Sequence, residues 1–100
     1  MTPKEFRALK SPHTLPIALQ ALWHDARGDW ERAHVLAQEA GGADGDWVHA
    51  YLHRKEGDEG NAGYWYSRAG HSKPDFSSDA EWSEITTALL AKQNVMAGKT

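Results

Sequence analysis

Apolar residues recur at intervals of three and four along most of this chain, in segments separated by glycine, proline and polar residues. The two clearest stripes consist of Leu19, Leu22, Trp23 and Ala26 in the first half and of Trp82, Ile85 and Leu89 near the end. Such spacing places apolar side chains on one face of a helix. Very little of the sequence alternates with the period of two that a half-buried strand requires. The pattern therefore predicts an all-α fold.

Helix start and stop signals divide the chain into six helices, over about residues 3–10, 16–28, 29–40, 46–57, 58–70 and 78–92. Thr2 and Ser78 each begin a capping-box pattern, and Asp29, Asp46 and Asp58 are expected N-caps. We expect the residues after 92 to fray. The sequence thus predicts a single domain, with helical hairpins over about 16–41 and 46–70 and a C-terminal capping helix over about 78–92.

An internal repeat relates the two predicted hairpins. Residues 18–41 align without a gap to residues 47–70, at an offset of 29. The identical pairs are Ala21/Ala50, His24/His53, Gly28/Gly57, Asp29/Asp58, Ala33/Ala62, Ala40/Ala69 and Gly41/Gly70. Alanine lets two helix backbones approach closely, and glycine accepts the left-handed conformation that ends a helix before aspartate begins the next. Each unit is therefore expected to be a helix, a tight Gly-Asp turn and a second helix.

The second helix of each unit carries a recognisable pattern. In the first unit it is GDWERA at 28–33, continuing to Ala37 and Ala40, and in the second it is Gly57-Asp58 followed by Ala62, Tyr66 and Ala69. These segments resemble the tetratricopeptide repeat, although the period is 29 residues against the usual 34. Ile17 and Asp46 stand where that family has an early tryptophan. The resemblance implies stacked antiparallel helices that bind a protein or peptide. Residues 49–70 are also similar to a group of short uncharacterised bacterial proteins, which implies no activity.

Composition narrows the classes of function. The chain has 100 residues and a formal charge of −3, which argues against a surface built for nucleic acid. It has no cysteine, so disulfides and thiolate metal sites are excluded. The first ten residues lack the apolar region of a signal peptide, and no apolar run is long enough to span a bilayer. We expect a cytoplasmic protein without nucleic-acid or membrane partners. Five tryptophans are many for this length and are expected to carry much of the packing.

His49 and His53 are the candidate metal ligands. They lie four residues apart, hence on one face of a helix, and Glu56 extends the same stripe. Two imidazoles at this spacing suit zinc, and His24, at the position equivalent to His53, is a candidate third ligand. The alternative is that the histidines form a polar face or hydrogen bond to neighbouring helices.

Three adjacent aromatic residues form the second candidate feature. Successive helical residues are about 100° apart, so these side chains point in different directions. Trp65 and Tyr66 fall on the same side as Ala62 and Ala69 and are expected in the core. Tyr64 falls nearly opposite, where it either packs against the last helix or contributes to an exposed recognition patch.

The sequence contains no phosphate-binding loop, nucleophile elbow or paired-carboxylate motif, so we expect neither catalytic residues nor a cofactor. The leading hypothesis is a non-enzymatic helical module that binds a protein or peptide partner through residues such as His49, His53 and Tyr64. One alternative is a small metal-binding protein that uses His49 and His53. Another is an accessory subunit whose patch is buried in an oligomer.

Overall fold

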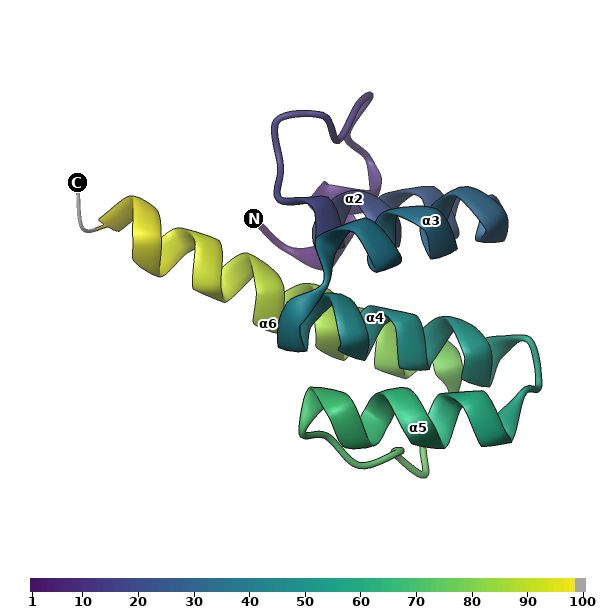
Figure 1. Cartoon of the computed structure of the whole chain (residues 1–100). Helices are drawn as coiled ribbons and strands as arrows, with labels where there is room; N and C mark the ends of the chain where they lie inside the picture. Colours follow the sequence, from purple (N-terminus) through teal and green to yellow (C-terminus); the bar gives the residue numbers. More distant parts are fainter. Residues whose placement is uncertain (99–100) are drawn as a thin grey trace.

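The computed structural model describes the backbone of residues 1–98 and the side chains of residues 1–93. Residues 1–98 contain helices and no strand, which confirms the predicted all-α fold. The helices are α1 (Pro3–Arg7), α2 (Ile17–Ala26), α3 (Trp30–Ala40), α4 (Gly42–Lys55), α5 (Glu59–Ala69) and α6 (Ser78–Gly98). In Figure 1, α4 lies between the α2–α3 pair and α5, and α6 passes behind it. The tetratricopeptide resemblance stays a prediction.

Gly-Asp turns connect the helices within each pair, as the sequence predicts. Gly28 and Gly57 have φ angles of 81° and 92°, in the left-handed region that favours glycine. The next residue, Asp29 or Asp58, caps the following helix by accepting the backbone N–H of the residue three positions on. These turns bring α3 back against α2 and α5 back against α4.

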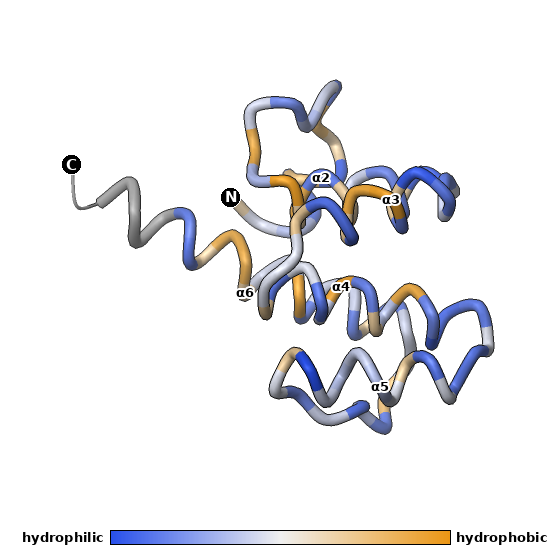
Figure 2. Tube along the Cα trace, in the orientation of Figure 1, coloured by the Kyte–Doolittle hydropathy of each residue, from blue (hydrophilic) through white to orange (hydrophobic). Residues whose placement is uncertain are grey.

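The core lies around α4, whose residues 47–53 are all buried. Four of the repeat-related alanines are fully buried at helix contacts: Ala21, Ala33, Ala50 and Ala62. The predicted stripe of α6 is buried as well, and the indole N–H of Trp82 donates to the carbonyl of Leu22 at 2.9 Å. Figure 2 colours α5 mainly in hydrophilic and neutral shades, so this helix packs through few residues.

Several predicted boundaries are wrong. The first helix ends at Arg7 instead of near residue 10, and the last continues to Gly98. The fourth begins at Gly42, not after a cap at Asp46. Asp46 instead lies 3.5 Å from the guanidinium of Arg68. The capping box at Thr2 is confirmed, whereas the last helix is capped one residue earlier than predicted, by the Ser77 hydroxyl.

Glu81, expected to close the second capping box, is instead buried and pairs with side chains of α4 and α5. Its carboxylate accepts the hydroxyl of Tyr66 and lies 2.9 Å from Arg54. A second buried carboxylate, Asp25, accepts the hydroxyl of Tyr51 and pairs with a lysine of α4 at 2.9 Å. These two networks fix α4 to α2, α5 and α6. None of the described helices combines the length and apolar character that crossing a membrane requires.

Candidate metal centre

His49 and His53 lie one turn apart on α4, as their spacing predicts. Both are buried, with exposed fractions of 3% and 8%. Their ring centroids are 4.9 Å apart and the rings are inclined by only 28°. The two imidazoles therefore stack along one face of the central helix.

A third imidazole comes from α3. The Nε2 atom of His34 lies 2.9 Å from Nε2 of His49, so one of these nitrogens donates a proton to the other. The rings of His34 and His53 are 5.1 Å apart between centroids. One ring nitrogen from each of the three histidines lies within 4.8 Å of the other two. We call His34, His49 and His53 the histidine triad.

The candidate third ligand named from the repeat, His24, is not part of the triad. It lies on α2, where its ring meets that of Trp23 edge-on. Equivalence in a repeat relates positions in successive units and does not bring their side chains together. Of the helices α2 and α3, it is α3 that packs more extensively on α4. The sequence feature that could have pointed to His34 is its position directly after Ala33, a fully buried residue of α3.

Glu56 orients one ring of the triad. Its Oε1 atom lies 2.8 Å from Nδ1 of His53, with the two residues on successive turns of the helix end. A carboxylate in this place holds the proton on Nδ1 and leaves the lone pair of Nε2 free. Metal-binding histidines commonly have such a partner, which fixes the ring and strengthens the ligand.

Two tryptophans enclose the triad from opposite helices. The indole of Trp30 stacks on His34, with centroids 4.9 Å apart and planes inclined by 9°. The indole of Trp65 stacks on His49 at 4.0 Å and 19°. Trp30 is itself held by α4, because its indole N–H donates to the carbonyl of Leu52 at 2.9 Å. These contacts restrain the rings of His34 and His49.

The triad lies where three helices meet. The α3 and α5 helices both pack on α4, yet within these fully described helices no Cα atoms of α3 and α5 come within 8 Å of each other. His34 therefore reaches the triad from one side of α4, and Trp65 covers it from the other.

Burial favours the neutral form of two imidazoles of the triad, those of His34 and His49. Burial, followed by the proximity of His34 and His53, lowers the pKa of His49 to about 4. Burial and then His53 also lower the pKa of His34, although Glu56 opposes the change. A neutral imidazole offers a lone pair to a metal, whereas an imidazolium does not.

This arrangement suits a borderline divalent ion. Zinc binds imidazole nitrogens at about 2.0–2.1 Å, so tetrahedral ligand nitrogens lie about 3.3 Å apart. The His34–His49 pair at 2.9 Å is a few tenths of an ångström closer than that, and the other pairs of ring nitrogens lie within 4.8 Å, so the rings would have to shift to share one ion. Both nitrogens must be free of a proton to bind the same ion, so metal binding would release the proton of this hydrogen bond.

Tyr64 points away from the core, as predicted, and is 55% exposed. Its ring meets Trp65 edge-on, and Arg68 donates to its hydroxyl at 3.3 Å. Trp65 and Tyr66 both face inward, and Tyr66 is the more buried of the two. Tyr64 is thus the predicted partner-binding residue that solvent reaches, and the ring of Trp65 connects it to His49.

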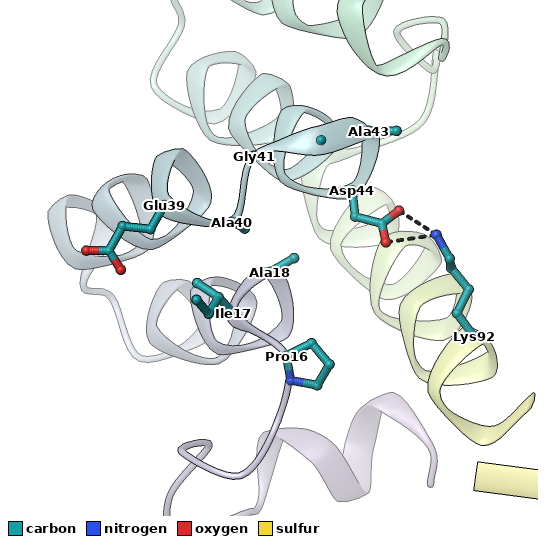
Figure 3. A pocket seen from close by; sticks show the side chains of 10 residues that line it. Pro16, Ile17, Ala18, Glu39, Ala40, Gly41, Ala43, Asp44 and Lys92 are labelled. Atoms are coloured by element: carbon teal, nitrogen blue, oxygen red, sulfur yellow. Dashed lines mark hydrogen bonds and ion pairs between the residues drawn. The ribbon is translucent and has the colours of Figure 1, made fainter. Parts of the chain in front are cut away.

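A surface pocket of about 370 Å³ lies elsewhere, between the beginnings of α2 and α4 and the α6 helix. Figure 3 shows Asp44 and Lys92 pointing toward each other across its edge, where they form an ion pair at 2.8 Å. Glu39 points away from that pair. Most of the remaining lining is small or apolar. Glu39 therefore does not join the Asp44–Lys92 ion pair at one point, whereas the three imidazoles of the histidine triad converge.

Comparison with protein-family models, with curated proteins and with solved structures gives no match. The function of this chain must therefore be argued from the geometry of the histidine triad.

Proposed function

We propose that this chain is a small metal-binding protein that holds one zinc or similar transition-metal ion at the histidine triad. The observation that carries the proposal is the convergence of three imidazole nitrogens from two helices within 4.8 Å. Histidine is the commonest ligand type for such ions, and three histidines occur in known zinc sites.

Supporting features separate this cluster from a chance contact of polar side chains. Glu56 prepares His53 to coordinate, and the two indoles restrain His34 and His49.

A thermal-unfolding experiment tests the proposal. Zinc at a hundred times its dissociation constant should stabilise the protein by about 2.7 kcal/mol, which corresponds to about 10 °C or more in a domain of this size. His34→Gln should lose most of that shift. His24→Gln is the matched control, because it removes a histidine outside the triad, and it should keep the full shift. Equal shifts in all three proteins would contradict the proposal.

Binding of a protein or peptide partner is a second candidate. It is supported by Tyr64, which is exposed and carries Arg68 beside its ring. Tyrosine and arginine are common at the centres of protein interfaces. A partner cross-linked to the wild type and lost from Tyr64→Ala, in a variant with unchanged melting temperature, would support this role.

A further inference from the structure

We infer that an ion held by the histidine triad keeps one open coordination position, and that this position takes a small monodentate anion. The inference rests on the proposed metal binding and specifies what else the metal would bind. It follows from the number of protein ligands, from the position of Glu56 and from the charge of the site.

The triad supplies three ligands, whereas zinc usually takes four. Among residues 1–93, no further histidine or acidic side chain joins the three within the same range. Residues 94–100 contain no histidine, cysteine, aspartate or glutamate. Sites with three protein ligands characteristically complete their shell with water or an exchangeable ligand.

Glu56 is the carboxylate that contacts the triad and is therefore the obvious candidate for a fourth ligand. Its position argues against that role. Its Oε1 atom is on Nδ1 of His53, at 2.8 Å. Because Glu56 occupies Nδ1, a metal at the triad would bind His53 through Nε2, on the other side of the ring. Glu56 groups with His53 and Asp58, in a set that does not include His34 and His49. Glu56 therefore orients the ligand and leaves the open position free.

Charge decides which class of ligand enters. Three neutral imidazoles leave the two positive charges of the ion uncompensated. The indoles of Trp30 and Trp65 cover the rings of His34 and His49 and lower the local dielectric, which strengthens attraction to an anion. His34 is only half-buried, so solvent reaches part of its ring. A small anion such as azide, bicarbonate or hydroxide fits these conditions.

Cobalt(II) substitution and azide titration test the inference on the wild-type chain. Cobalt(II) replaces zinc in nitrogen sites, and its visible absorption reports its coordination. We expect cobalt bands at one ion per chain, and a saturable change in those bands with one azide per cobalt. Cobalt bands that do not respond to azide would overturn the open position while leaving metal binding intact. If no bands form at all, both proposals fail.

Glu56→Gln provides the matched variant. It should need more cobalt for full loading, because Glu56 strengthens His53 as a ligand. Once loaded, it should still respond to azide, because Glu56 does not occupy the open position. A response present in Glu56→Gln but absent from the wild type would identify Glu56 as a fourth ligand and overturn the inference. The zinc-induced thermal shift of the same variant reports metal binding independently of azide.

Discussion

Lowering the pH from 7 to 5 is expected to destabilise the metal-free protein through His49. Burial and the neighbouring His34 and His53 lower the pKa of this imidazole from 6.5 to about 4. In the unfolded chain it titrates near 6.5. Between these two values the unfolded state binds a proton that the folded state does not. The free energy of unfolding therefore falls as the pH falls through this window.

The expected loss of stability follows from the difference between the pKa of His49 in the unfolded chain and its pKa in the folded protein. Each pH unit below 6.5 removes up to about 1.4 kcal/mol, so His49 alone costs about 2 kcal/mol at pH 5. His34 acts in the same direction, because burial lowers its pKa too. Hydrogen bonds lower the pKa of the carboxyls of Glu5 and Asp58, whose contributions to stability are lost only in more acidic solution. The range from pH 6.5 to 5 thus isolates the histidines.

Urea unfolding followed by circular dichroism, in the presence of a chelator, measures this dependence at pH 7, 6 and 5. The His49→Gln variant should lose most of the decrease between pH 6.5 and 5, whereas His24→Gln should keep it. A wild type whose free energy of unfolding is the same at pH 7 and pH 5 would refute the reasoning. An undiminished decrease in His49→Gln would refute it as well.

Three further predictions concern stability and can be checked by chemical denaturation. Gly45→Ala should destabilise the protein, because the added Cβ would lie 2.8 Å from a backbone carbonyl oxygen of α3. Gly63→Ala, with open space around it, should instead stabilise the protein by about 0.5–1 kcal/mol. A Gly45→Ala variant more stable than Gly63→Ala would contradict the close packing of α4 on α3. Glu81→Gln should cost about 3–5 kcal/mol because it removes, among residues 1–93, the only carboxylate that pairs with the largely buried guanidinium of Arg54. Glu59→Gln removes one partner of an exposed ion pair and should cost less than about 1 kcal/mol. If Glu59→Gln and Glu81→Gln lost equal stability, burial would not determine the strength of these ion pairs. Ala33→Trp and Ala62→Trp should each unfold the domain by overpacking a fully buried helix contact, and wild-type stability in both would refute the predicted repeat alignment.

Features set by local chemistry could be predicted from the sequence. The Gly-Asp turns at residues 28–29 and 57–58 need only a residue that tolerates positive φ and a side chain that caps the next helix. The first turn of α4 could not be predicted in the same way. Its backbone packs so closely on α3 that only a glycine fits at position 45, which is a property of the tertiary contact. Asp46 consequently lies inside the helix instead of at its cap.

The candidate metal site likewise has a part that the sequence predicts and a part that it does not. The neighbouring positions of His49 and His53 follow from helical periodicity alone. The inclusion of His34, and the exclusion of His24, depend on which helix packs beside α4. The stacking of Trp65 on His49 depends on how α5 returns across the same helix. Such contacts join residues distant in sequence, so no local pattern specifies them.

Metal content after dialysis tests the central claim most directly. Chelator-stripped protein is dialysed against dilute zinc and then against buffer, and its zinc is measured by mass spectrometry. The wild type should retain one zinc per chain, His24→Gln should match it, and the double variant His34→Gln with His53→Gln should retain almost none. A wild type that retains no zinc, or a double variant that retains as much as the wild type, would contradict the histidine triad as a metal centre.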